Sequence, residues 1–390
     1  MARIHLLLAF ILILGGIVMG APVRAAEPIQ VIAVFNLTGP DSALDVSAYN
    51  GARLAAEQIN ARGGVLARPI ELVTVDSASQ TGETAEKVAA ALKRHPRAIA
   101  GVGFAYNTYA LAAGPVFQAA GLPFISPGAT GPKVPEQVGD DMFLIAYSDD
   151  AQAQVMASFA RNELKLSRAA VWINEERDYT RNVGRVFAQA FEKLGGKVHV
   201  VSFESRKTDF SKLIAEVQSS EPKAQAIYGA SMPSTAVTLI GQVRAAGVEV
   251  PLLSGDGWDE KDIVELSKKK RIGAIYFTTH RFLDVHTPEM KAFVAAYAKT
   301  YGEAPSDAFA PLGFDAVNLL ANAIERAGSA KPSAIRSALA ATKDFPGLVG
   351  DISYAANKRI PNKAVSVVRV DNGAETVLWT GRAKAPVKSD

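Results

Sequence analysis

The 390-residue sequence contains no cysteine, and it is poor in the side chains that catalysis most often uses. Without cysteine the chain has no disulfide, no thiol nucleophile and no thiolate metal site. The histidines are scattered, and none lies in an HExxH pattern. They are His5, His95, His199, His280 and His286. We therefore expect no bound metal ion.

The common catalytic motifs are missing as well. Gly229-Ala230-Ser231-Met232-Pro233 lacks the second glycine of a GxSxG elbow, and no GxxxxGK[ST] loop occurs. Gly101-Val102-Gly103 opens like a dinucleotide fingerprint, but Tyr106 stands where the third glycine is needed. Catalysis by carboxylates alone stays open, because an acid–base pair has no recognisable spacing. We predict that the protein is not an enzyme and uses no cofactor.

A strong net charge is also absent. The formal net charge is +3, and it falls to +1 when the two arginines of residues 1–25, Arg3 and Arg24, are removed. A near-neutral chain lacks the electrostatic footprint of a nucleic-acid or anionic-membrane binder. Lys268-Lys269-Lys270-Arg271 is the one dense basic run, and we interpret it as a solvated helix end. We predict no nucleic-acid partner.

The first 25 residues predict a secretory signal peptide. Arg3 supplies a positive start, Leu6 to Val18 are almost uninterruptedly apolar, and Val23-Arg24-Ala25 suits cleavage after Ala25. The alternative is a membrane anchor, because the apolar run approaches spanning length. We favour the signal, since a polar domain begins a few residues later. With no cysteine at the cleavage site to carry a lipid, we expect an untethered protein in the periplasm.

From Ile29 onward, short apolar strands alternate with amphipathic helices. This alternation predicts an α/β fold with parallel sheets covered on both faces. It restarts after about residue 147, which indicates two similar lobes, and Asp371-Asn372-Gly373 predicts a closing hairpin. The predicted strands are 29–36, 70–75, 98–102, 123–126, 169–173, 197–203, 224–228, 272–277, 350–354, 364–370 and 375–380. The clearest predicted helices are 46–61, 108–120, one capped by Thr81 that ends at Lys93, and a helical stretch at 307–340.

Two loops stand where predicted strands end and helices begin. They are Phe104-Ala105-Tyr106-Asn107-Thr108 and Gly128-Ala129-Thr130, the second within the stretch PFISPGATGPKV. Ligands of open α/β sheets bind at the carboxyl ends of the strands, where helix N-termini attract carboxylates. Each loop could equally be an ordinary turn. We interpret the pair as a rim of backbone N–H groups and hydroxyls for a small anion.

Two further polar residues follow strand ends. Asp256 could pair with an ammonium group, and Tyr179 could cover an apolar body. The plainer interpretations are a helix N-cap for Asp256 and a half-exposed tyrosine for Tyr179. Because all four features lie at strand ends, we favour a binding site.

The residues resemble the periplasmic solute-binding proteins of the branched-chain amino acid type, the leucine/isoleucine/valine-binding family of ABC transporters. The resemblance rests on GARLAAEQINARGGV, IELVTVDSAS, PFISPGAT, KTDFSKLIAEVQ and GQVRAAGVEVPLLSGDG in this order. It implies the type I periplasmic binding fold, in which two Rossmann-like lobes are joined by three crossing segments and close by hinge motion. The crossings would fall near Tyr147, Thr279 and Asp351. The lobes would comprise 27–146 plus 279–350, and 147–278 plus 351–385.

The resemblance also implies where each part of a ligand would bind. Thr130 would bond the ligand carboxylate, and a backbone group of Gly128 would bond the amine. Ala105 departs from the serine that amino acid binders often have, so a backbone N–H, Tyr106 or Asn107 would have to compensate.

From the second lobe, Tyr179 would cover the ligand and Asp256 would hold its ammonium, in place of the family's longer glutamate. Ser231 replaces a tyrosine, and Leu44 stands where some relatives have an aromatic. The predicted ligand-binding residues are Leu44, Ala105, Tyr106, Asn107, Gly128, Ala129, Thr130, Tyr179, Ser231 and Asp256.

The function implied by the resemblance is capture of an amino acid or related small carboxylate, which a monomer then presents to an ABC permease in the inner membrane. The changed pocket residues leave an aromatic-acid or amide binder of the same fold as alternatives. A ligand-sensing receptor module is another, because the same two lobes can report occupancy to a different partner.

Overall fold

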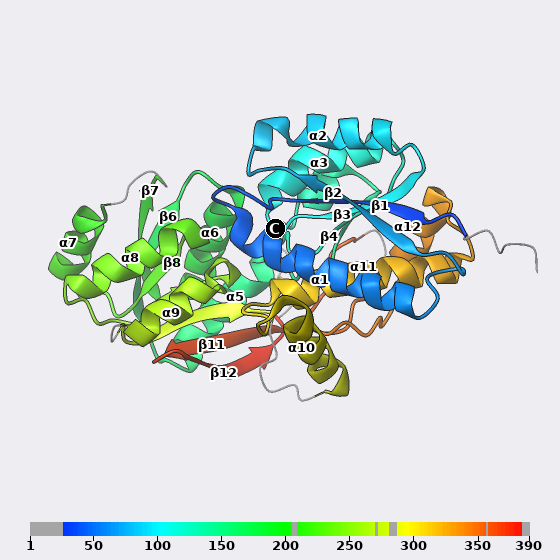
Figure 1. The fold of residues 1–390 in the computed structure, drawn as a ribbon. Coiled ribbons are helices and arrows are strands. Elements are labelled where there is room, and N and C mark those ends of the chain that lie inside the picture. Colours follow the sequence, from blue (N-terminus) through cyan, green and yellow to red (C-terminus); the bar gives the residue numbers. More distant parts are fainter. Residues whose placement is uncertain (1–25, 205–208, 270–271, 281–286, 356–357, 384–390) are drawn as a thin grey trace, which may run out of the picture.

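The protein consists of two lobes that lie side by side, each built on its own β-sheet (Figure 1). The computed structural model describes residues 26–204, 209–269, 272–280, 287–355 and 358–383. The predicted signal peptide, 1–25, lies outside these residues. We call the lobe around the five-stranded sheet the first lobe and the one around the seven-stranded sheet the second lobe.

The first lobe has an all-parallel sheet with the order β2-β1-β3-β4-β5. Its strands are β1 (Ile29–Phe35), β2 (Ile70–Asp76), β3 (Ala98–Gly103), β4 (Phe124–Ser126) and β5 (Met142–Leu144). Its helices are α1 (Ser42–Ala61), α2 (Thr81–Arg94), α3 (Asn107–Ala119), α4 (Val134–Val138), α10 (Pro288–Tyr301), α11 (Phe309–Ala327) and α12 (Pro332–Ala340). Every βα connection within residues 29–138 brings the chain to the edge of the sheet that faces the second lobe.

The second lobe has the strand order β12-β11-β10-β9-β8-β6-β7. Its strands are β6 (Arg168–Asn174), β7 (Lys197–Phe203), β8 (Ile227–Ala230), β9 (Leu252–Ser254), β10 (Ile275–Thr279), β11 (Val365–Asp371) and β12 (Ala374–Gly381). Its helices are α5 (Asp149–Asn162), α6 (Asp178–Lys193), α7 (Ser211–Ser219), α8 (Pro233–Ala245), the short η1 (Asp256–Trp258) and α9 (Lys261–Lys269). The strands from β6 to β10 pair in parallel, whereas β11 and β12 are antiparallel to their neighbours.

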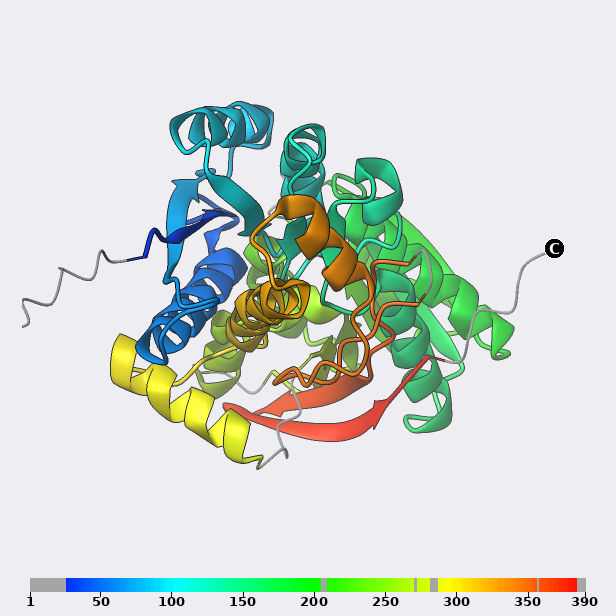
Figure 2. The ribbon, with the colours of Figure 1, turned by 90° about the vertical axis from the view of Figure 1, so that its right-hand side faces the viewer.

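The predicted closing hairpin is confirmed. β11 and β12 pair antiparallel from Asp371 opposite Ala374, at the edge of the second sheet (Figure 2). Asn372 and Gly373 form the two-residue turn with φ of +50° and +80°. Two positive φ angles in succession are what a type I′ turn requires, and Asn-Gly adopts them at least cost.

Several predicted details are wrong. Thr81 does not cap its helix, because Gln80 occupies the N-cap position and Thr81 is already helical. Residues 350–354 form no strand; Ile352 makes only an isolated bridge with Phe345. The strands predicted at 224–228 and 272–277 begin three residues later, and β5 was not predicted.

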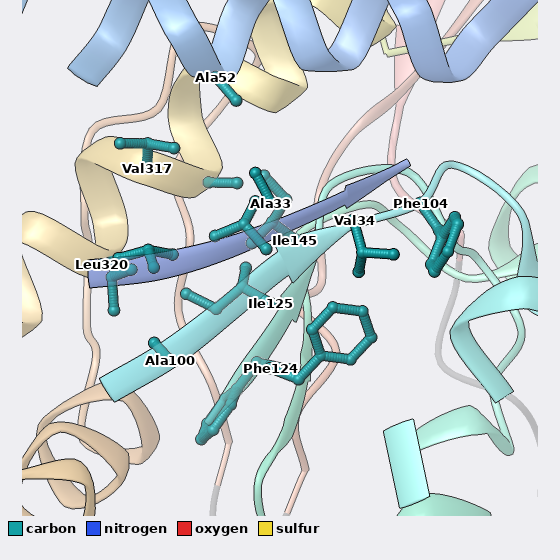
Figure 3. Packing of buried hydrophobic residues seen from close by; sticks show 14 of the residues in the cluster. Ala33, Val34, Ala52, Ala100, Phe104, Phe124, Ile125, Ile145, Val317 and Leu320 are labelled. Carbon is teal, nitrogen blue, oxygen red and sulfur yellow. The ribbon is translucent and has the colours of Figure 1, made fainter. Parts of the chain in front are cut away.

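Buried apolar side chains fill the space between α1, α11 and the first sheet (Figure 3). Ala33 of β1 and Ala100 of β3 are fully buried there together with Val317 and Leu320 of α11, whereas Val34 points to the opposite face of the sheet, where Phe124 lies. No helix within the described part of the chain is both long enough and apolar enough to span a bilayer.

The chain passes between the lobes at three places. The first crossing joins β5 to α5, the second joins β10 to α10, and the third joins α12 to β11. The crossings contact one another: Leu144 N–H donates to Arg359 O at 2.9 Å, and Tyr354 OH donates to Leu144 O at 3.0 Å. This gives the three-segment connection that the fold class requires. The lobe limits 27–146 plus 279–350 and 147–278 plus 351–385 stay predictions.

Helices α1 and α11 pack so closely that glycine is needed at their contact. A Cβ atom on Gly313 would lie 1.8 Å from Ala48 O, and one on Gly51 would lie 1.8 Å from Ala310 O. Gly313→Ala should therefore lower the free energy of unfolding by about 3 kcal/mol, because neither backbone can yield without separating the helices. Urea unfolding measures this change.

Gly241→Ala is the matched control for this substitution. Gly241 lies within helix α8, and an added Cβ there would meet no atom within 4 Å. The control should stabilise the protein by about 0.5–1 kcal/mol through helix propensity. Equal effects of the two substitutions would contradict close packing of α1 on α11.

Candidate functional site

A narrow cavity lies between the two lobes. Both lobes line it at the carboxyl ends of their parallel strands, as expected for open α/β sheets. The lining residues are Leu44, Ala105, Tyr106, Asn107, Thr108, Gly128, Thr130, Arg177, Tyr179, Met232, Asp256, Gly257 and Phe309. Eight of the ten predicted ligand-binding residues are among them.

The other two predicted residues, Ala129 and Ser231, lie behind the cavity wall. Ala129 is fully buried, and its N–H donates to Ser126 Oγ at 3.0 Å. Ser231 is also fully buried, and its hydroxyl accepts from Trp258 Nε1 at 2.9 Å. Both polar groups are thus used within the protein. The next residue, Met232, lines the cavity instead of Ser231.

The loop that contains Gly128 and Thr130 is not a rim of free N–H groups. Asn107 Oδ1 accepts from both Thr130 N–H and Gly131 N–H, each at 2.8 Å. Asp149 N–H in turn donates to Thr130 O at 2.8 Å. These bonds hold the loop against the N-terminus of α3 and against the start of α5. The anion-binding interpretation is therefore wrong for these two N–H groups.

The N-terminus of α3 offers the positive end of a helix to the cavity. The first backbone bond here runs from Ala110 N–H to Tyr106 O, so Asn107, Thr108 and Tyr109 have N–H groups without an acceptor inside the helix. Tyr106, Asn107 and Thr108 line the cavity. A ligand carboxylate is favoured at such a helix end.

The N–H of Ala105 cannot replace the missing serine. It donates to Asp45 Oδ1 at 2.5 Å, while Asp45 Oδ2 accepts from Asn36 N–H at 2.8 Å. Burial raises the pKa of Asp45 to about 8, although these two hydrogen bonds oppose the shift. The Asn107 side chain is used by the loop as well, so the role of the missing serine is left to Tyr106 or to the N–H groups at the start of α3.

Gly128 is required by the narrowness of the cavity. A Cβ atom at this position would lie 2.7 Å from Phe309 Cδ1 and 3.0 Å from Ala105 Cα. Any side chain would therefore collide with Phe309 and Ala105. Leu44, Met232 and Phe309 add apolar surface around this point.

Asp256 carries the buried carboxylate of the site. It is 3% exposed and lines the cavity. Its Oδ1 accepts from Gln152 Nε2 at 2.9 Å, and its Oδ2 lies 3.3 Å from His280 Nε2. The N-cap interpretation is wrong, because Gly255 is the N-cap of η1 and Asp256 makes no capping bond.

Tyr179 is held over the cavity by the segment that follows Asp256. Its hydroxyl accepts from Gly257 N–H at 2.9 Å, and its side chain is half-buried. The ring therefore forms a wall on the side of the second lobe. Both the covering role and the half-exposed position that the sequence suggested are compatible with this geometry.

An ion pair joins the two lobes at the cavity. Arg177 Nη2 of the second lobe lies 2.8 Å from Asp41 Oδ2 of the first, and Tyr109 OH donates to the same oxygen at 2.7 Å. Arg177 also lines the cavity. The pair links the α6 start to the α1 start, and it can form only when the lobes are together.

Arg177, Met232 and Phe309 were not predicted. Arg177 and Met232 are close in sequence to the predicted Tyr179 and Ser231, which was a usable signal. Phe309 has no predicted site residue near it in the sequence. It lies at the start of α11, and only the folding of the chain after the second crossing brings this helix to the cavity.

The fold and the cavity define a two-lobed α/β ligand-binding protein. The profile of the family described as "Periplasmic binding protein" matches residues 28–375, so the chain belongs to this family. It is a periplasmic binding protein of the ABC transporter type. The relatives it matches are binding proteins and not enzymes.

Individual relatives are similar over most of their length. The Leu/Ile/Val-binding protein BraC3 of Rhizobium johnstonii is 27% identical over 362 residues, which cover 90% of this chain and 94% of that protein. The branched-chain amino acid transporter substrate-binding protein LivJ of Streptococcus pneumoniae, solved with isoleucine, has a TM-score of 0.83 at 27% identity, covering 91% of this chain and 99% of that one. An ABC transporter solute-binding protein of R. palustris, solved with benzoate, shares the fold at 19% identity, with a TM-score of 0.81, covering 93% of this chain and 98% of that one.

A pH dependence follows from Asp149, the first residue of α5. It is 1% exposed, and burial raises its pKa to about 8. The folded state therefore binds this proton more tightly than the unfolded state, whose carboxyl titrates near pH 4, and stability falls as the pH rises between the two values. Asp149→Asn removes this titration. Relative to the variant, the wild type should lose about 1.4 kcal/mol of unfolding free energy per pH unit between pH 5 and pH 7.

Urea unfolding of both proteins at pH 5 and pH 7 measures the difference. Asp150→Asn, one residue further along α5 where the side chain is half-buried, is the matched control and should leave the pH dependence of the wild type in place. Parallel pH dependences of the wild type and Asp149→Asn would show that Asp149 is ionised in the folded protein.

Proposed function

We propose that this protein is the periplasmic capture component of an ABC transporter for an amino acid of the branched-chain type. The observation that carries the proposal is the Asp256 carboxylate, which is buried at the cavity and is held by neutral donors. A buried carboxylate attracts a cation strongly, since little solvent screens it. The ammonium group of an amino acid supplies such a cation.

The rest of the cavity suits the other parts of an amino acid. The N-terminus of α3 favours a carboxylate, and Leu44, Met232 and Phe309 favour an aliphatic side chain. BraC3 and LivJ, which are named for leucine, isoleucine and valine or for branched-chain amino acids, support the same ligand class.

Transport requires a partner and a compartment, and both belong to this proposal. The closed protein would present its ligand to a permease in the inner membrane, after export through the predicted signal peptide. The Asp41–Arg177 ion pair supports a closed state in which both lobes contact the ligand. A gene for a permease next to this one would favour transport over a sensory role.

The ligand class is tested by thermal shift. The mature chain is unfolded, dialysed and refolded to remove any carried-over ligand, and is then mixed with aliphatic amino acids, amides or aromatic acids. A ligand at a hundred times its Kd should stabilise the fold by about 2.7 kcal/mol. We expect a shift with leucine, isoleucine or valine. A shift only with aromatic acids would reject an amine-binding site while leaving the family and the fold in place.

The role of Asp256 is tested by Asp256→Asn, which keeps the shape and removes the charge. Affinity for an aliphatic amino acid should fall by about 2–5 kcal/mol, as for other buried charge pairs that lose one partner. Isothermal titration calorimetry measures it. Asp262→Asn, on the exposed first turn of α9, is the control and should bind like the wild type. Unchanged affinity of Asp256→Asn would exclude it as the ammonium anchor.

A further inference from the structure

His280 is a fully buried histidine at the second crossing between the lobes. It follows β10 directly, and its side chain has no exposed surface. Its ring stacks on Tyr147 with a centroid distance of 3.5 Å and an interplanar angle of 15°. Tyr147 lies in the first crossing, between β5 and α5. The stack therefore joins two crossing segments, and it fixes the plane of the imidazole.

The edge of this imidazole faces the carboxylate of Asp256. His280 Nε2 lies 3.3 Å from Asp256 Oδ2. The other ring nitrogen, Nδ1, is buried and has no hydrogen-bond partner among the described residues. A proton on Nδ1 would thus be an unsatisfied buried donor, so the neutral ring carries its proton on Nε2. His280 then donates to Asp256.

Burial favours a neutral histidine at this position. Burial lowers the pKa of His280; Asp256 and Asp259 oppose the shift, and Lys363 of the third crossing reinforces it. A neutral donor orients the Asp256 carboxylate without cancelling its charge. The negative charge stays available to a ligand in the cavity.

Gln152 of α5 holds the other oxygen of the same carboxylate. Its Nε2 donates to Asp256 Oδ1, while its Oε1 accepts from Asp256 N–H at 2.9 Å and from Thr278 Oγ1 at 2.7 Å. Each carboxylate oxygen therefore has one neutral donor from the protein. Because a carboxylate oxygen has two acceptor sites, capacity remains for an ammonium donor.

We propose that His280 is a positioning residue that aims the Asp256 carboxylate at the amine of the ligand, and that it thereby sets the preference of the site for amine-bearing ligands. The proposal rests on the proposed function, because it assigns the Asp256 side of the cavity to an ammonium group. In this arrangement the crossing segments both connect the lobes and hold the group that recognises the amine.

Two substitutions separate the hydrogen bond from the ring packing. His280→Phe keeps an aromatic ring against Tyr147 and removes the donor. His280→Gln loses the ring and keeps an N–H group at the place of Nε2. His199→Gln, on the exposed strand β7, is the control for loss of a histidine elsewhere. Urea unfolding verifies that each variant is folded.

The probes are L-leucine and 4-methylpentanoate, which has the same carbon skeleton without the amine. Calorimetric titration gives the Kd of leucine, and competition gives that of 4-methylpentanoate. His280→Phe should weaken leucine binding about tenfold, the loss expected for one hydrogen bond to a charged group, and should change 4-methylpentanoate binding less than twofold. His280→Gln should bind leucine within about threefold of the wild type, because the donor is restored.

Several results would overturn the proposal. Leucine binding that His280→Phe leaves unchanged would do so, as would equal weakening of both probes. A His280→Gln variant no better than His280→Phe would mean that the ring, and not the donor, matters. If 4-methylpentanoate does not bind the wild type, the proposal is decided by comparing the leucine affinities of His280→Phe and His280→Gln.

The proposed function and this inference can fail separately. A wild type that binds no aliphatic amino acid would reject both of them. A wild type that binds leucine, with no effect of the His280 variants, would reject only the inference.

Discussion

The carboxylate of Asp256 is buried in the cavity wall, and within the described part of the chain no lysine or arginine side chain is bonded to it. A buried charge is costly unless it is hydrogen-bonded or paired. Gln152 and His280 provide neutral donors, so the charge is tolerated but not cancelled. Their own positions depend on α5 and on the second crossing. The connection between the lobes and the polar end of the cavity are therefore one structural unit.

The first lobe contributes the complementary polarity. The N-terminus of α3, the positive end of the helix dipole, faces the cavity. The Asn107 side chain accepts a hydrogen bond from Thr130 N–H and so holds the loop that contains Thr130. The Asp41–Arg177 ion pair connects the first lobe to the second beside the cavity. A ligand with both charges would contact both lobes at once, which is how binding energy is converted into closure in a hinged protein. At least two ion pairs join the lobes, Asp41–Arg177 at the cavity and Lys261–Glu303 away from it.

Secondary structure was most predictable where local signals agreed. β7 occupies the predicted residues 197–203, and the Asn372-Gly373 turn defined its hairpin, because period-two patterning and turn chemistry act over a few residues. The stretch 350–354 failed for the opposite reason. Its apolar residues Ile352 and Tyr354 pack into the first-lobe core as part of a crossing, and apolar content alone does not distinguish such a segment from a strand.

The sequence by itself determined the α/β class, the two-lobed organisation implied by the family resemblance, and the strand ends where polar residues gather, since these follow from periodicity and short motifs. Only the tertiary structure decided which polar groups face the cavity. Ser231 and the N–H of Ala105 are used by Trp258 and Asp45, whereas Phe309 reaches the cavity from a segment that no local pattern marks. The reason is physical: a hydrogen-bonding group binds whatever partner folding brings to it, and that partner can lie anywhere in the chain.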